Sequence, residues 1–300
     1  MSKLMSLQEA IARFVQDGDL VYAAGFTHLI PFAAGHEIIR QRKRNLILAR
    51  ATPDLIYDQM VAAGCARKII FSYMGNPGVG SLRMVRAAIE RGELEWEEYS
   101  HFGMISRLQA GAAGLPFMPM RQTGATDLER ANPNIRRITD PYSGEEVIVV
   151  PALNPDVAIV HVQRADVQGN AHLWGIIGEQ KEAAFAARRV ILTAEEIVDE
   201  EVIRSDPNRT LIPGFIVSAV CHVPYACHPS YAQGYYDRDN AFYLQWDKIS
   251  ESPQAVQEWL EEWVYGVRDR QEYWEKLGPE VHQRLRVPPR WSQPVNYGSY

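Results

Sequence analysis

The chain has 300 residues, of which 46% are hydrophobic and 23% are charged, so it holds enough apolar material for one large or two smaller globular domains. Its net charge of −6 and sequence pI of about 5.8 argue against a nucleic-acid-binding protein. Three cysteines are too few for a disulfide framework and indicate a reducing compartment.

The sequence contains no signal for secretion or membrane insertion. Residues Met1–Ser6 lack the apolar region of a signal peptide. No stretch of about 18 apolar residues is present that could span a bilayer. We therefore expect a cytoplasmic protein with neither a membrane nor a nucleic-acid partner.

The amino-terminal segment has the pattern of a helix, a buried strand and a second helix. Ser6 and Glu9 have the spacing of a capping box, which begins a short helix. Residues 18–24 predict a buried strand, and a helix is expected over 31–41. Gly25 stands where the strand should end, and glycine there lets the backbone turn sharply and a ligand come close. Because ligands bind at the carboxyl ends of strands in open α/β sheets, this turn predicts a pocket.

The alternation of strands and helices continues along the chain. Strands are expected at 45–49, 68–73, 94–99, 146–150, 157–162 and 190–193, and helices at 53–63, 81–91, 101–113 and 181–188. Ser81 is expected to cap the helix that it begins. Near-continuous apolar runs suit parallel strands buried on both faces. The pattern predicts an α/β fold with an open, mostly parallel sheet and helices on both faces.

The carboxyl-terminal part differs in composition. Residues 213–243 are rich in aromatics, prolines and glycines and show few clear periods, whereas Ser252 to about Leu277 predicts one helix. We expect an α/β domain over residues 1–245. Residues 246–300 are expected to form a carboxyl-terminal helix and tail that pack on this domain or on a partner. Disorder is the alternative for the tail after Val287.

Two segments leave a ligand-binding and a structural interpretation open. The loop 75–80 is glycine-rich but has neither the dinucleotide fingerprint nor a Walker motif. It is either a plain connection or a place where backbone N–H groups face a ligand oxygen. The basic run 40–44 closes a helix, where cations are favoured, and contact with a phosphate is the alternative.

Cysteine and histidine residues do not predict a metal site. Cys221-His222 and Cys227-His228 lack the spacing of zinc ligands, so packing or lining a pocket is favoured. Cys65 follows a glycine at a helix end and is expected to be structural. No Gly-x-Ser-x-Gly elbow is present, so an esterase triad is unsupported.

His101 is the candidate catalytic residue of the chain. It follows Tyr99-Ser100 at a strand-to-helix junction and suits a general acid or base. A histidine that only hydrogen-bonds its neighbours is the alternative. Glu93, Glu95 and Glu97 alternate along the preceding strand, a pattern more typical of a solvated sheet edge than of a catalytic pair.

Short motifs follow one another in a characteristic order over about residues 5–240. They are Gly25-Phe26-Thr27 with Pro31, Ile69 to Gly75, Gly92-Glu93-Leu94-Glu95, Tyr99-Ser100, Leu115-Pro116-Phe117-Met118-Pro119, Pro151-Ala152-Leu153, Ala165-Asp166-Val167-Gln168-Gly169-Asn170-Ala171, Glu195-Glu196-Ile197-Val198 and Leu211-Ile212-Pro213-Gly214-Phe215. Together they resemble the A (alpha) subunit of the class I CoA-transferases, closest to the glutaconate CoA-transferase branch.

The resemblance implies the open α/β fold of that family and a separate B (beta) subunit of similar fold, in an α2β2 assembly. It implies a coenzyme A thioester as substrate, with no bound cofactor and no metal. In this family a glutamate of the B subunit attacks the acyl-CoA and forms a glutamyl-CoA thioester. The A subunit would then supply the facing wall of the pocket. Its substrate-binding candidates are Gly25, Phe26, Thr27, Ser72, Asn76, Ser100 and His101.

Related pairs also open a ring of a steroid-derived CoA thioester or decarboxylate a branched glutaconyl-CoA. Ring-opening relatives carry a glutamate of the A subunit near the junction that holds His101 here, and neither Ser100 nor Phe102 supplies an acid. We therefore expect transfer of CoA between an acyl-CoA and a short dicarboxylic or keto acid. A hydrolase or decarboxylase subunit is the alternative, and a catalytically silent binding subunit is a third hypothesis.

Overall fold

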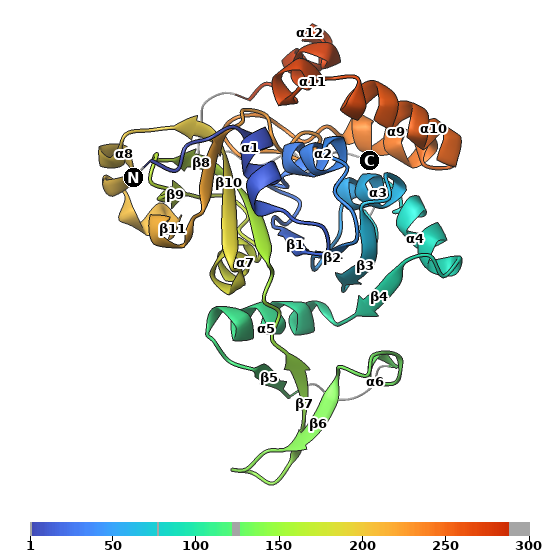
Figure 1. Ribbon diagram of the computed structural model, residues 1–300. Coiled ribbons are helices and arrows are strands. Elements are labelled where there is room, and N and C mark those ends of the chain that lie inside the picture. Colours follow the sequence, from blue (N-terminus) through green and yellow to red (C-terminus); the bar gives the residue numbers. More distant parts are fainter. Residues whose placement is uncertain (1, 77, 122–126, 288–300) are drawn as a thin grey trace.

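A nine-stranded sheet forms the body of the protein in the computed structural model, which describes residues 2–76, 78–121 and 127–287 (Figure 1). Its parallel strands lie in the order β12-β10-β8-β1-β2-β3-β4. They are β1 (Leu20–Ala23), β2 (Leu46–Ala49), β3 (Ala66–Phe71), β4 (Glu95–Glu98), β8 (Val157–Ala165), β10 (Arg189–Ile197) and β12 (Ala219–His222). The predicted mostly parallel sheet is confirmed.

Strand β1 lies at the centre of this sheet, between β2 and β8. Val21 pairs with Leu48 on one side and with Val157 on the other. The chain then adds β2, β3 and β4 outward in one direction, while β8, β10 and β12 extend the sheet in the other. Such a reversal of strand order opens a crevice outside the carboxyl ends of the strands, which is where open α/β sheets bind ligands.

Helices cover both faces of the sheet because successive strand residues point to opposite sides. Val21 and Ala23 pack into the core under α1 (Leu7–Phe14), α2 (Phe32–Arg40), α3 (Leu55–Ala62) and α4 (Arg83–Glu90). Tyr22 instead belongs to the core on the other face, with α5 (His101–Ala112) and α7 (Gln180–Ala186). The capping box of Ser6 and Glu9 is present at the start of α1.

A three-stranded antiparallel sheet extends from the body below α5 in Figure 1. It consists of β5 (Phe117–Met120), β7 (Glu146–Pro151) and β6 (Arg136–Thr139), with the short α6 (Leu128–Ala131) before β6. Only β7 was predicted from the sequence. All four residues of β6 are exposed and β5 contains Pro119, so neither has the apolar alternation that marks a strand.

Short elements complete the main sheet at the far end of β8. These are β9 (Ala171–His172) and β11 (Thr210–Ile212), both antiparallel to their neighbours, with α8 (Glu200–Arg204) and the 3-10 turns η1 (Pro207–Arg209) and η2 (Gly214–Ile216). The expected cap at Ser81 is wrong. Helix α4 begins at Arg83 after Leu82, and the Ser81 N–H donates to Asp247 Oδ1 at 3.3 Å.

The single helix predicted over 252–277 is also wrong. The segment forms α10 (Pro253–Leu260), the π-helical turn η3 (Glu261–Tyr265) and α11 (Arg270–Leu277). Gly266 ends the π turn, where a Cβ atom would lie 2.8 Å from the carbonyl oxygens of Glu261 and Glu262. Asp269 then caps α11 by accepting from the Glu272 N–H at 2.9 Å.

These carboxyl-terminal helices pack on the face that carries α2 and α3. Trp246 of α9 (Asn240–Ile249) and Leu260 of α10 are fully buried in the same core as β1. Helix α12 (Pro279–Arg284) follows α11. The division at residue 245 stays a prediction, and the tail from Pro288 onward lies outside the described residues. No helix within the described ranges is long and apolar enough to cross a membrane.

Candidate active site

The loops that follow β1, β2, β3 and β4 meet at the carboxyl edge of the sheet. They carry Gly25, Arg50, Ser72 and His101, each one to three residues after the end of its strand. Because the strands are parallel, these four loops lie on one edge, at the strand-order reversal beside β1. The turn at Gly25 thus lies beside the strand-order reversal, where open α/β sheets bind ligands, and the pocket there stays a prediction.

The turn after β1 has a backbone that few residues adopt. Gly25 has φ +133°, and Thr27 and Leu29 have φ values of +56° and +55°. A Cβ atom on Gly25 would lie 2.8 Å from the carbonyl oxygens of both His28 and Leu29. Only glycine satisfies both demands, which is the physical reason for the glycine that the sequence places there.

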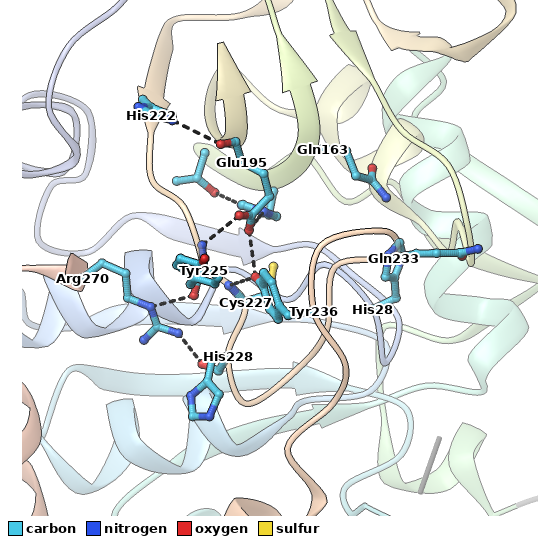
Figure 2. Close-up of polar contacts among 12 residues, drawn as sticks. His28, Gln163, Glu195, His222, Tyr225, Cys227, His228, Gln233, Tyr236 and Arg270 are labelled. Atoms are coloured by element: carbon cyan, nitrogen blue, oxygen red, sulfur yellow. Dashed lines mark hydrogen bonds and ion pairs between the residues drawn. The ribbon is translucent and has the colours of Figure 1, made fainter. Parts of the chain in front are cut away.

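His28 fastens this turn to two other loops. Its ring is fully buried, with Nδ1 3.0 Å from the Ile176 carbonyl and Nε2 accepting from the Gln233 N–H at 3.0 Å. Nδ1 therefore carries the proton and donates to Ile176. Burial lowers the pKa of His28 to about 3, so the imidazole is neutral at physiological pH. Figure 2 shows His28 beside Gln233.

Ser72, His101 and Phe26 form an open rim next to the turn. The Ser72 Oγ lies 2.8 Å from His101 Nδ1, and the Phe26 and His101 rings meet edge to face with centroids 5.8 Å apart. The Ser72 hydroxyl donates its one hydrogen to the Ala51 carbonyl at 2.5 Å. It therefore accepts from Nδ1–H of His101, which leaves Nε2 of the neutral ring with a lone pair for a substrate proton.

Two predicted contacts are placed differently. Ser100 is the cap of α5, where its Oγ accepts from the Gly103 N–H at 3.0 Å. Asn76 is buried in the loop after β3, where its N–H donates to the Gly80 carbonyl at 3.0 Å. In the described part of the chain Asn76 makes no hydrogen bond to Phe26, Ser72 or His101. The structure thus brings the turn, Ser72 and His101 into direct contact.

The loop between β12 and α9 supports the turn from behind. The Ser230 Oγ donates to the Thr27 carbonyl at 2.8 Å, and the Leu29 N–H donates to the Tyr231 carbonyl at 2.9 Å. No hydrophobic periodicity in residues 213–243 indicated that this loop supports the turn. The signal was the density of buried aromatic and histidine residues, which need fixed hydrogen-bond partners.

A buried polar network holds that loop in place (Figure 2). Glu195 of β10 accepts from the Tyr236 hydroxyl and the Tyr225 N–H, both at 2.8 Å, and lies 2.9 Å from His161 Nε2. Arg270 of α11 donates to the carbonyls of Tyr225 and His228. The motif that begins at Glu195 is therefore part of the support and lies behind the rim.

Of the two cysteine and histidine pairs, Cys221, Cys227 and His228 are buried, whereas His222 is exposed. Cys221 and Cys227 are both fully buried, and burial raises the pKa of the Cys221 thiol to about 12. Cys65 is likewise buried, as expected for a structural residue. Within the described residues, His, Cys, Asp and Glu side chains form no group of three that could hold a metal ion.

The basic run 40–44 and the glycine-rich loop 75–80, whose roles the sequence left open, both make contacts within the chain. Arg40 donates to the Val264 and Val267 carbonyls at 3.1 Å, and the Arg42 guanidinium lies 4.8 Å from the centroid of the Tyr265 ring. The basic run thus attaches α2 to the carboxyl-terminal helices. In the glycine-rich loop, the Val79 N–H donates to the Asn76 carbonyl and the Asn76 N–H to the Gly80 carbonyl, both at 3.0 Å, so two of its backbone donors serve the loop itself.

The sheet edge at β4 is more than a solvated row of carboxylates. β4 is an edge strand of the main sheet and Glu95 is exposed, as expected. Glu97, however, forms an ion pair with Lys68 at 2.5 Å and accepts from the Tyr99 hydroxyl at 2.8 Å. These partners lower the pKa of Glu97 against the opposing effect of its partial burial.

Comparison with known proteins points to one family. The family model described as coenzyme A transferase matches residues 4–222. The A subunit of 3-oxoadipate CoA-transferase from Pseudomonas knackmussii is 51% identical over 280 residues, covering 92% of this chain and 99% of that relative.

Solved structures agree with this similarity. Glutaconate CoA-transferase from Acidaminococcus fermentans has a TM-score of 0.90 at 35% identity, covering 96% of each chain. A variant of the decarboxylase AibA/AibB has a TM-score of 0.76 at 30% identity, covering 87% of this chain and 98% of that one. The same scaffold is thus found in proteins named for different reactions.

Proposed function

This chain belongs to the coenzyme A transferase family, and we propose that it is the A subunit of an enzyme that moves CoA from an acyl-CoA thioester to a 3-oxo dicarboxylic acid. The observation that carries this proposal is the 51% identity to a 3-oxoadipate CoA-transferase subunit across 99% of that relative. The decarboxylase relative is less similar, at 30% identity.

The geometry supports a pocket that a second chain completes. In the described residues, no carboxylate makes a hydrogen bond or ion pair to Ser72, His101 or the 25–27 turn. Carboxylate chemistry at this edge therefore needs a group from elsewhere, and we propose the glutamate of a B subunit. That carboxylate attacks the thioester carbonyl and releases the CoA thiolate, and the thiolate then attacks the glutamyl carbonyl of the resulting anhydride, which gives glutamyl-CoA and frees the donor acid as a carboxylate. The acceptor carboxylate passes through the same two steps in reverse, leaves as its CoA thioester and restores the glutamate.

Within this proposal the residues of this chain have separate tasks. The backbone turn at Gly25, Phe26 and Thr27 lines the acyl group. His101 uses the lone pair on Nε2 to accept a hydrogen bond from an N–H or O–H group of the CoA thioester, and Ser72 fixes the tautomer that makes this possible. Ser100 acts through the helix that it caps. We retain Asn76 as a contact to the substrate only through its buried side-chain amide, whose Nδ2 has no partner in the described residues.

Exposed aromatic side chains beside the rim support the second subunit. Tyr73 follows Ser72 and is 51% exposed, and Phe102 follows His101 and is 61% exposed. Aromatic residues that are exposed in one chain are enriched at the cores of protein interfaces. We propose that the B subunit covers Tyr73 and Phe102, and that the complete enzyme is an α2β2 assembly.

The test is a reconstitution of the two chains. The A chain and the proposed B subunit are purified separately, mixed, and supplied with succinyl-CoA and 3-oxoadipate. We expect free succinate and 3-oxoadipyl-CoA in equal amounts, and neither chain should be active alone. Light scattering of the mixture should give the mass of two A and two B chains.

Two further assays separate the alternatives. Loss of succinyl-CoA without any acceptor acid would identify a hydrolase, and release of carbon dioxide a decarboxylase. Hydroxylamine should inactivate the enzyme only after incubation with acyl-CoA, because it traps the glutamyl thioester. If no B-subunit glutamate is modified, the transferase mechanism is wrong. Glutaconate replaces 3-oxoadipate in a parallel reaction to rank the two acids.

A further inference from the structure

Arg50 contacts the turn from inside the protein. It follows β2 directly, is 1% exposed, and its Nη2 donates to the Gly25 carbonyl at 2.5 Å. In the described part of the chain, Arg50 is the one side chain that hydrogen-bonds to Gly25. Ser230 and His28 restrain the turn only further along, from Thr27 onward.

The hydrogen bond from Arg50 can stabilise the strained backbone of the turn. Three residues between Gly25 and Leu29 have positive φ values, and such backbone persists only where surrounding contacts impose it. A charged donor on a neutral carbonyl is among the stronger hydrogen bonds available in a protein interior. The Gly25 carbonyl is therefore held at the point where β1 ends and the pocket begins.

A second buried charge offers a competing explanation. Glu179 precedes α7, is 2% exposed, and accepts from the Tyr22 hydroxyl at 3.2 Å. Burial raises the pKa of Glu179, and the positive charge of Arg50 opposes that rise. On this explanation Arg50 serves only to neutralise Glu179.

We propose that Arg50 is a positioning residue for CoA transfer, whose guanidinium fixes the Gly25 carbonyl and so the turn that faces the thioester. This inference rests on the proposed function. The Nε and Nη1 atoms of Arg50 have no hydrogen-bond partner in the described residues, so its hydrogen bonding there is directed to Gly25 alone. A group placed only to neutralise Glu179 would instead bond to that carboxylate.

The test separates two effects of removing Arg50: the loss of the cation near Glu179 and the loss of the hydrogen bond to the Gly25 carbonyl. Arg50→Met leaves Glu179 buried without its cation, whereas Arg50→Met/Glu179→Gln removes both charges. Both variants are assembled with the B subunit. We expect the double variant to recover at least half of the loss in melting temperature caused by Arg50→Met. Its kcat should stay at least roughly 10-fold below wild type with KM within about 3-fold, because a misplaced turn costs rate more than binding.

Arg50→Lys provides a variant that keeps the positive charge beside Glu179. Its shorter ammonium group cannot reproduce the planar guanidinium contact, so we expect a wild-type melting temperature with kcat reduced about 5-fold or more. Wild-type kcat in either Arg50→Lys or the double variant would overturn the proposal. A wild-type complex that transfers no CoA would refute the proposed function instead, whatever the Arg50 variants do.

Arg107 offers a matched control. It is also buried, donates from Nε to the Pro151 carbonyl at 3.0 Å, and lies 3.7 Å from the carboxylate of Glu97. Arg107→Met/Glu97→Gln removes the same kinds of group, a guanidinium and a carboxylate, at a place that does not contact the turn. We expect a lower melting temperature with kcat within about 3-fold of wild type. An equal loss of kcat in both double variants would show that the effect is not specific to Gly25, and would count against the proposal.

Discussion

The turn after β1 and the rim formed by Ser72 and His101 lie on the same sheet edge but are built in opposite ways. In the turn Gly25, His28 and Leu29 are buried, and the segment carries positive φ values and is held by Arg50 and His28. At the rim His101 is exposed and Ser72 is half-buried, and Phe102 beside them is 61% accessible. The difference teaches that this chain organises one wall of the pocket by itself and leaves the other face open, as the proposed two-chain site requires.

The largest effect should come from Gly25→Ala. The new Cβ would lie 2.8 Å from two carbonyl oxygens at a φ of +133°. Strain and overpacking together should lower the free energy of unfolding by about 2–5 kcal/mol, measured by urea denaturation. Gly114→Ala is the control, since Gly114 also has a positive φ but no atom near its Cβ position. Equal losses in the two variants would mean that the turn is not tightly enclosed.

His101→Ala should separate activity from stability at the rim. We expect kcat of the assembled enzyme to fall by about 10-fold, because a hydrogen bond to the substrate is lost. The free energy of unfolding of the isolated chain should change by less than about 0.5 kcal/mol, because the side chain is exposed. A wild-type kcat in this variant would mean that His101 has no role in transfer and only hydrogen-bonds Ser72.

Acidification should destabilise the enclosed wall. The pKa values of His28 and His228 are lowered to about 3 and about 4 in the folded chain, mainly by burial. Between those values and about 6.5 the unfolded chain binds protons that the folded chain does not, so stability is complete above pH 6.5 and falls with pH below it.

Each histidine should contribute about 1 kcal/mol per pH unit to that loss. Urea denaturation between pH 7 and pH 5 measures the slope. His28→Gln should reduce the slope of the unfolding free energy against pH by the contribution of one titrating histidine, although the variant is less stable at every pH. A slope identical to that of wild type would mean that His28 is protonated in the folded chain.

The smallest effect should be that of Phe102→Ser on association. Loss of an exposed aromatic anchor should weaken binding of the B subunit by about 5- to 10-fold, measured by calorimetry. The isolated chain should unfold as wild type does. Phe215→Ser is the control, since Phe215 is 82% exposed in η2, which follows β11. Equal weakening by both substitutions would argue against a B-subunit contact at the rim.

Local signals in the sequence determined most of the main sheet. The apolar runs of β1, β2, β3, β8 and β10 and the capping box of α1 depend on neighbouring residues alone, so they could be recognised without the fold. The same holds for Gly25, whose positive φ follows from a turn at the end of a buried strand, and for His101 at the start of α5. The ordered motifs likewise indicated the family that the comparisons confirm.

Only the tertiary structure decided which of these residues meet. The position of β1 between β2 and β8 depends on pairing between strands more than 130 residues apart in the chain, and no local pattern encodes it. His28 and Ser230 support the turn through contacts that are similarly distant in the chain, and Arg50 reaches Gly25 across two adjacent strands, so their roles could not be predicted from their own surroundings in the sequence. The break in the carboxyl-terminal helix differs, because Gly266 lies against the carbonyl oxygens of Glu261 and Glu262 in its own π turn, a local geometry that the helical pattern did not reveal.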